Sequence, residues 1–120
     1  MKKIFFLLFI IFNIQVSAQC WKTVKSGDFH TLGIKTDGTL WAWGSNDNGQ
    51  LGDGTTIGKT TPVSVIGGGV TEVSLGNNHS CAVVSGALKC WGDNRFGQLG
   101  DGTIINKSRP VTIINSGVTQ

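Results

Sequence analysis

An internal repeat is the feature of this 120-residue chain that most restricts its fold. When the chain is shifted by 48 residues, residues 43–66 align with residues 91–114, and 15 of the 24 aligned positions are identical. The longest shared run, Gly-Gln-Leu-Gly-Asp-Gly-Thr, occupies residues 49–55 and again residues 97–103. Ahead of this block the offset is 49, so one residue has been lost between His79 and Gly86. A period of this length is typical of solenoids and propellers.

Each repeat carries signals for short β-strands and lacks helical periodicity. The expected strands cover residues 30–34, 40–43, 63–66 and 70–75. They are rich in branched and aromatic side chains, and Asp37-Gly38 between the first two is a strong hairpin signal. The 18 glycines of the chain recur at fixed offsets between the strands. This pattern predicts an all-β fold with about four strands in each repeat, as in the blade of a β-propeller.

The first 18 residues have the three parts of a secretory signal peptide. Lys2 and Lys3 precede nine consecutive apolar residues, 4–12, and Val16-Ser17-Ala18 supplies small residues where cleavage occurs. Nine apolar residues are too few to cross a bilayer, which needs about 20, so no membrane span is expected. A buried core segment is the alternative, and a lipid anchor on Cys20 is disfavoured because Gln19 is not small. The sequence thus predicts a secreted, periplasmic or cell-surface protein.

The repeat also sets the expected domain boundaries. We expect a first propeller repeat over residues 19–69, a second over residues 70–117 and the start of a third at residues 118–120. The third is expected because Gly69-Val70-Thr71 recurs as Gly117-Val118-Thr119. The chain is therefore expected to be the N-terminal piece of a longer protein, whose remaining repeats would pack against it.

The charge of the chain argues against one class of partner. The whole chain has a net charge of +3, and removal of residues 1–18 leaves eight basic and seven acidic residues, a net charge of +1. No block of basic residues remains, so binding to nucleic acid is not expected.

Two copies of one pattern resemble the regulator of chromosome condensation repeat family. The first copy is Gly27, His30, Trp43, Gly44, Asn46, Gly49, Gln50, Leu51 and Gly52. The second is Gly76, His79, Trp91, Gly92, Asn94, Gly97, Gln98, Leu99 and Gly100. The resemblance implies a seven-bladed propeller with one four-stranded blade per repeat, of which this chain holds about two. Founding members of the family are nuclear nucleotide exchange factors for a small GTPase, and other relatives are exported bacterial proteins.

Recurrence in both repeats indicates a structural role for these residues, because an active-site residue normally occurs once. The glycines suit tight turns and close approaches of backbone to backbone. We expect Trp43 and its counterpart to provide buried area between blades, and Leu51 and its counterpart to fill the layer beneath. His30 and its counterpart are expected to start a strand and to bond to backbone.

No catalytic, metal or cofactor site is expected. The two histidines lie in different repeats, which disfavours a histidine metal site. Residues 46–49 resemble part of a calcium loop, but Gly44 stands where the first acidic ligand belongs. Residues 58–60 resemble the end of a phosphate loop, but Asp53 stands where a glycine is required. No nucleophile–base set is visible, so the chain is predicted to bind a partner and not to be an enzyme.

The cysteines of the second repeat are predicted to form a disulfide bond. Counted from a two-residue turn at residues 85–86, Cys81 lies opposite Cys90 in a non-hydrogen-bonded pair. Cα atoms in such pairs are about 4.5 Å apart, at the short edge of disulfide geometry. Export favours oxidation, and two buried free thiols are the alternative.

The first repeat carries no cysteine pair. A three-residue turn at residues 36–38 places Leu32 opposite Ala42, so an apolar pair stands where the second repeat has its cysteines. Cys20 either meets a cysteine beyond residue 120 or stays free.

Positions that differ between the two repeats nominate contacts with a partner, because variable residues on a constant framework usually carry recognition. The candidates are Trp41, Asp47, Asn48, Lys89, Arg95 and Phe96. Trp41 is expected on the opposite side of its strand from Trp43. The favoured function is an exported binding scaffold for a protein or a surface glycan. The alternatives are an accessory propeller domain of a larger secreted enzyme and, by family analogy, guanine-nucleotide exchange.

Overall fold

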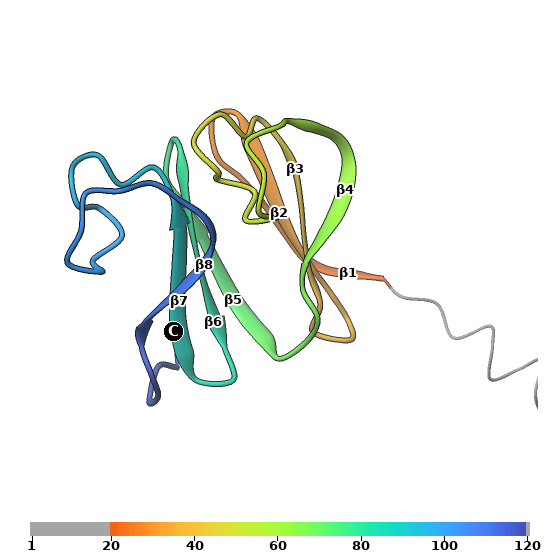
Figure 1. Ribbon diagram of the computed structural model, residues 1–120. Helices are drawn as coiled ribbons and strands as arrows, with labels where there is room; N and C mark the ends of the chain where they lie inside the picture. The colour runs from red at the N-terminus through yellow and green to blue at the C-terminus, as the bar shows by residue number, and fades with distance from the viewer. Residues whose placement is uncertain (1–19, 120) are drawn as a thin grey trace, which may run out of the picture.

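The computed structural model describes residues 20–119, which form two antiparallel four-stranded sheets (Figure 1). The first sheet contains β1 (Trp21–Ser26), β2 (His30–Lys35), β3 (Leu40–Gly44) and β4 (Lys59–Ile66). The second contains β5 (Val70–Leu75), β6 (His79–Val84), β7 (Ala87–Gly92) and β8 (Lys107–Ile114). Within each sheet the strands follow one another in chain order. The all-β, blade-like fold predicted from the repeat is confirmed, and the predicted signal peptide lies outside the described residues.

The central hairpin of each sheet has the register that its turn predicts. In the second sheet Ser85 and Gly86 both have positive φ, as a two-residue hairpin turn with the strand twist requires, and Cys81 pairs with Cys90. In the first sheet Gly38 alone has positive φ in a three-residue turn, and Leu32 pairs with Ala42. The one-residue deletion between the repeats therefore falls in the turn and leaves the strand pairing unchanged.

The last strand of each sheet starts earlier than the sequence suggests. We expected a strand from residue 63, after Pro62, but β4 begins at Lys59 and includes this proline. Proline is tolerated here because β4 is an edge strand, and its pairing with β3 is irregular between Ala42 and Gly44. The second sheet repeats the arrangement with Pro110 inside β8.

The core lies between the two sheets, which stand side by side in Figure 1. The buried cluster is formed by Leu32, Ile34, Leu40, Ala42 and Leu51 of the first repeat and by Val70, Val73, Ala82 and Trp91 of the second. Because each sheet hides one face against its neighbour, the sheets depend on each other for burial, as expected of stacked repeats.

Backbone hydrogen bonds also link each repeat to the start of the next. The Val70 N–H donates to the Gly38 carbonyl at 3.0 Å, so the hairpin turn of the first sheet holds the first residue of β5. The Val118 N–H donates to the Gly86 carbonyl at 2.9 Å in the same way. The described part of the chain has no helix that is long and apolar enough to cross a membrane.

Candidate interaction surface

A long loop follows the third strand of each sheet, and a buried asparagine fixes its shape. In the first long loop, residues 45–58, the Asn46 side chain donates to the Thr55 carbonyl at 2.9 Å and accepts from the Leu51 N–H at 3.0 Å. In the second long loop, residues 93–106, Asn94 makes the same bonds to Thr103 and Leu99, both at 3.0 Å. Both asparagines are fully buried. Each loop therefore holds its conformation through its own polar contacts.

An aspartate supports each long loop. Burial alone raises the pKa of Asp53, but hydrogen bonds from Lys59, Thr55 and Asn46 outweigh burial and lower the pKa to about 2. The Thr103 hydroxyl and N–H bond to Asp101, and its pKa is also lowered to about 2. Both carboxylates are thus ionised at neutral pH and accept hydrogen bonds within their loops.

The first long loop is seated on the second sheet. The Gln50 carbonyl accepts two hydrogen bonds from that sheet, from the Trp91 indole N–H at 2.9 Å and from the Ser80 hydroxyl at 2.8 Å. Farther along, the Gly54 N–H donates to the Ser108 carbonyl at 2.8 Å. A Cβ on Gly52 would lie 2.6 Å from the indole nitrogen of Trp91, so only glycine fits at this position.

His30 lies buried in the seam between the sheets. Its Nε2 is 2.9 Å from the Ser80 hydroxyl, which donates its only proton to the Gln50 carbonyl, so Nε2 donates to Ser80. Burial, followed by the nearby charge of His79, lowers the pKa of His30 to about 4. His30 starts β2 as predicted, but this hydrogen bond goes to a hydroxyl. Ser80 follows His79 at the start of β6 and lies between the ring and the backbone of Gln50.

The second long loop has the same internal bonds but no sheet against it in the described residues. Gln50 is 1% exposed and Gly52 is buried, whereas their counterparts are less covered: Gln98 is partly exposed and Gly100 is exposed. A Cβ on Gly100 would meet only the tip of Ile113, at 3.7 Å. Leu99 nevertheless remains 2% exposed, because it packs within its own repeat.

The outer face of the first sheet is aromatic. Trp43 is only partly buried, whereas Trp91 is fully buried, and the ring centroids of Trp43 and Trp21 are 5.5 Å apart. The Lys35 ammonium lies 4.1 Å from the Trp41 ring centroid and 5.2 Å from that of Trp21. The expectation that Trp41 and Trp43 face opposite sides is wrong. Residues two apart on a strand share a face, and these three tryptophans cluster together.

Four of the six nominated contact residues lie in the long loops, at one end of the two sheets. These are Asp47, Asn48, Arg95 and Phe96. The other two, Trp41 and Lys89, lie on β3 and β7, and the Lys89 ammonium donates to the Thr112 hydroxyl at 2.8 Å. Arg95 forms an ion pair with Asp93 at 2.8 Å, and Phe96 beside it is 87% exposed. A cavity of about 510 Å³ adjoins Phe96, Arg95 and His79.

Sequence reasoning missed further exposed apolar residues at the same loop end. They are Phe29, Ile57, Ile104 and Ile105, each more than 60% exposed. Their signal in the sequence is an apolar side chain inside a loop rich in glycine, asparagine and aspartate. With Phe96 they form what we call the loop-end patch. Exposed large apolar side chains gathered at one end of a soluble protein are typical of interaction sites.

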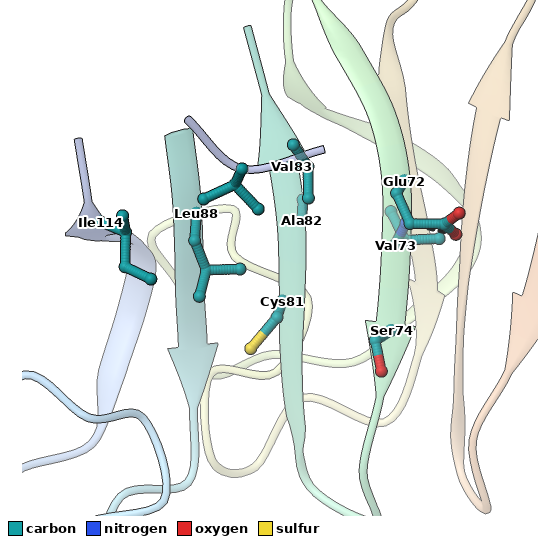
Figure 2. Close-up of a pocket in the computed structure, with 9 residues that line it drawn as sticks. Glu72, Val73, Ser74, Cys81, Ala82, Val83, Leu88 and Ile114 are labelled. Atoms are coloured by element: carbon teal, nitrogen blue, oxygen red, sulfur yellow. Dashed lines mark hydrogen bonds between the residues drawn. The ribbon is translucent and has the colours of Figure 1, made fainter. Parts of the chain in front are cut away.

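Cys81 and Cys90 form a disulfide with their Cα atoms 4.1 Å apart, as the hairpin register predicts. Cys81 lines a groove on the face of the second sheet that points away from the first. Val83, Leu88 and Ile114 line the same groove (Figure 2). We call this surface the open face of the second sheet. Cys20 is exposed and has no disulfide partner among residues 20–119. No cluster of metal-ligating side chains occurs within that range.

Comparison with solved structures shows the same architecture. Over 82% of its length the chain superposes on Prp20p from Saccharomyces cerevisiae with a TM-score of 0.72 at 20% identity. It superposes over 83% of its length on human WBSCR16 with a TM-score of 0.71 at 19% identity. The match covers 26% and 28% of those chains, so the resemblance is one of fold over about a quarter of each neighbour.

Curated relatives show closer identity over shorter stretches. The chain is 36% identical over 64 residues to the RCC1 domain-containing protein RUG3, mitochondrial, of Arabidopsis thaliana. It is 40% identical over 62 residues to the human E3 ubiquitin-protein ligase HERC2. These matches cover 51% and 49% of this chain but only 14% and 1% of the relatives.

Family models give the most extensive match. The regulator of chromosome condensation (RCC1) repeat model matches residues 37–83 and 85–120, and a second model of the same repeat matches residues 21–50 and 70–98. Together these matches include both long loops, both buried asparagines and the seam between the sheets. The chain therefore belongs to the regulator of chromosome condensation (RCC1) repeat family.

Proposed function

We propose that this protein is an exported β-propeller repeat protein that binds a protein or a surface glycan through the loop-end patch. The observation that carries the proposal is the concentration of exposed large apolar side chains, Phe29, Ile57, Phe96, Ile104 and Ile105, in the loops at one end of the sheets. Exposing such side chains in water is unfavourable, and surfaces of this kind are typically covered by a partner.

The constancy of the framework supports this assignment. The buried asparagines and aspartates hold both long loops in one conformation, whereas the tips differ: Asp47-Asn48 in the first loop and Arg95-Phe96 in the second. A rigid framework with variable tips lowers the entropic cost of binding and lets recognition change without loss of the fold. Prp20p (yeast RCC1), a neighbour in fold, is described by its binding to Gsp1p and histones and by its complex with Kap60.

The proposal is tested by a double substitution at the patch, Phe96→Ser with Ile104→Ser, in the purified chain. Binding is measured to a glycan array and to intact cells of the source organism. We expect bound signal from the unaltered chain and at least a tenfold loss from the double variant. The matched control is Val24→Ser, because Val24 is 49% exposed but lies on β1, outside the patch. Equal binding by all three chains, or none by any of them, would reject the patch as the site.

Export is tested separately. The proposal expects the mature protein outside the cytoplasm with Gln19 at its N-terminus, which N-terminal sequencing of the secreted fraction detects. An intact Met1 on a cytoplasmic protein would remove export from the proposal. It would also make guanine-nucleotide release by a small GTPase the activity to measure next.

A further inference from the structure

The isoleucines of the loop-end patch are exposed although their backbone is fixed from below. The Ile57 carbonyl accepts hydrogen bonds from the buried Asn46 side chain at 3.1 Å and from the Lys59 ammonium at 2.9 Å, yet the Ile57 side chain is 69% exposed. In the second long loop the Asn94 side chain binds the Ile105 carbonyl at 3.0 Å, and Ile105 is 64% exposed. The same buried network therefore holds one exposed apolar side chain in each repeat.

This exposure does not depend on a neighbouring repeat being absent. The first long loop is covered by the second sheet, with Gly52 against the Trp91 indole, and residues 56–58 are nevertheless exposed. Thr61, farther along on β4, is exposed as well. Their counterparts are residues 104–106 and Arg109. Because the two repeats share this loop and strand, we expect these counterparts to stay accessible when a further repeat covers the second long loop.

Arg109 brings an uncompensated positive charge to this surface. It is exposed on β8, and its guanidinium has no hydrogen-bond or ion-pair partner within residues 20–119. The other cations at this end, Lys59, Arg95 and Lys107, each form an ion pair with an aspartate of their own loop. Arg109 is thus the cation of this end that is available to a partner among the described residues.

Gly54 of the first long loop positions the Arg109 guanidinium. A Cβ on Gly54 would lie 2.6 Å from Cζ and 2.9 Å from Nε of Arg109, so the guanidinium occupies the space that a side chain at position 54 would fill. The Gly54 N–H donates to the Ser108 carbonyl, which fixes the strand against the loop at this point. Arg109 is therefore held across the seam between the repeats, against the same loop that presents Ile57.

We propose that the loop-end patch binds a protein that presents an Asp or Glu carboxylate beside apolar side chains, and that Arg109 receives this carboxylate. The inference rests on the proposed function and names the partner class of that site. A guanidinium offers N–H donors in a fixed fork that matches a carboxylate, and arginine is enriched among the residues that dominate binding at interfaces. Three of the five side chains of the patch are isoleucines, which offer apolar area but no hydrogen bond to the hydroxyls of a glycan.

The partner class is tested by selecting short random peptides, displayed on phage, against the purified chain. We expect the enriched peptides to carry Asp or Glu flanked by apolar residues. Arg109→Gln should weaken binding of the synthesised peptides at least tenfold, measured by fluorescence anisotropy. Arg109→Lys should restore part of it, because an ammonium keeps the charge without the fork. The matched control is Lys22→Gln, which removes a positive charge from an exposed position on β1 and should leave binding unchanged.

Alanine at Gly54 tests the positioning of the guanidinium, with Gly102→Ala as its control. The two glycines have φ of 85° and 82°, but nothing lies within 4 Å of a Cβ on Gly102. Gly54→Ala should therefore weaken peptide binding several-fold, and Gly102→Ala should not. In the Arg109→Gln background Gly54→Ala should add little, because both changes act on the same guanidinium. A full additional loss in that background would overturn the positioning of Arg109 by Gly54.

The remaining outcomes separate failure of this inference from failure of the proposed function. Peptides that lack acidic residues, and that lose binding to Phe96→Ser/Ile104→Ser but not to Arg109→Gln, would overturn the role of Arg109 and leave the patch as a binding site. Glycans bound through the patch, with no peptide enriched, would overturn the protein partner alone. Peptides that bind every variant equally, or the absence of any ligand of either kind, would overturn both.

Discussion

The two long loops contain the same seven-residue run and the same internal hydrogen bonds, yet one is covered and the other is exposed. Residues 49–55 lie under Trp91 and against β8, whereas residues 97–103 have no sheet over them in the described structure. The Asn46 and Asn94 networks are nevertheless the same to within 0.1 Å in the bonds compared above. Local polar contacts therefore set the conformation of the loop, and the neighbouring sheet contributes burial.

The second long loop therefore already has, without a covering sheet, the conformation that the first long loop has when it is covered. A preformed loop does not lose backbone entropy when it docks, so more of the buried area contributes to association. The following substitutions separate the contribution of the loop from that of the sheet that covers it.

The largest difference in stability is expected between the alanine variants of Trp91 and Trp43. Trp91→Ala should destabilise the chain by about 3–5 kcal/mol, because it removes a fully buried side chain and leaves a cavity at the seam. Trp43→Ala should cost clearly less, because Trp43 is only partly buried and packs on Trp21. Urea unfolding monitored by far-ultraviolet circular dichroism measures both. Equal losses would mean that the covering of Trp91 by the first long loop adds nothing.

Acid should weaken the seam through His30. Its pKa is about 4 in the folded chain and 6.5 in the unfolded chain, so the unfolded chain binds more protons between these values. Stability from the neutral imidazole is complete above pH 6.5 and is lost as the pH falls toward 4, by at most about 3 kcal/mol.

The midpoint of urea unfolding, measured at several pH values between 7.5 and 4, should report this loss of stability. His30→Gln is the control. This variant should be less stable at pH 7.5 but should have a flatter pH profile over that interval. If its profile instead runs parallel to that of the unaltered chain, another group is responsible for the acid sensitivity.

Alanine substitutions at Gly52 and Gly100 should separate the cost of backbone strain from the cost of a steric collision. Gly52 and Gly100 have φ of 81° and 80°, so Ala at either position costs about 1 kcal/mol in backbone strain. At Gly52 the new Cβ also collides with the Trp91 indole, which adds about 1–3 kcal/mol. The difference between the two losses in free energy of unfolding isolates the cost of the collision. A difference near zero would show that the Trp91 side chain moves aside at little cost.

The smallest expected effect concerns the disulfide. Cys90→Ala opens a loop closed by cysteines nine residues apart, for which chain entropy gives at most about 2–3 kcal/mol. The hairpin already forms part of that closure, so the smaller end of this range is expected. The first sheet keeps the same register with Leu32 opposite Ala42.

Thermal melting of the oxidised chain, compared with Cys90→Ala, checks this expectation. The melting temperature should fall modestly while the sheets remain folded. Thiol labelling of the non-reduced secreted protein provides the separate check on oxidation, and free labelling of both cysteines would contradict the pairing.

The repeat predicted the sheets, the hairpin register and the Cys81–Cys90 pair because each depends on local spacing. The offset of 48 and the turn lengths alone place Leu32 opposite Ala42. The start of β4 was missed because proline was treated as a strand boundary, whereas an edge strand has no ladder donor to lose at Pro62.

The seam and the loop-end patch were less predictable. The hydrogen bond between His30 and Ser80 joins residues 50 apart, and the sequence does not state which hydroxyl of the next repeat meets the ring. The prediction that Trp41 and Trp43 face opposite sides of the strand was wrong, because residues two apart on a strand share a face. Ile57 was missed because comparison of the repeats selects variable positions, and Ile57 is conserved between them as Ile105. Phe29 does vary, since Asn78 stands at its position in the second repeat, but it lies outside the long loops to which the comparison was applied.

The bond between each hairpin turn and the following strand has a consequence for the order of folding during synthesis. The Gly38 carbonyl is in place as soon as the first hairpin has closed, and it receives the Val70 N–H when that residue emerges. Gly86 then receives Val118 in the same way. Each finished repeat thus provides a template edge for the next, and the chain can fold vectorially from its N-terminus with contacts that reach only one repeat ahead.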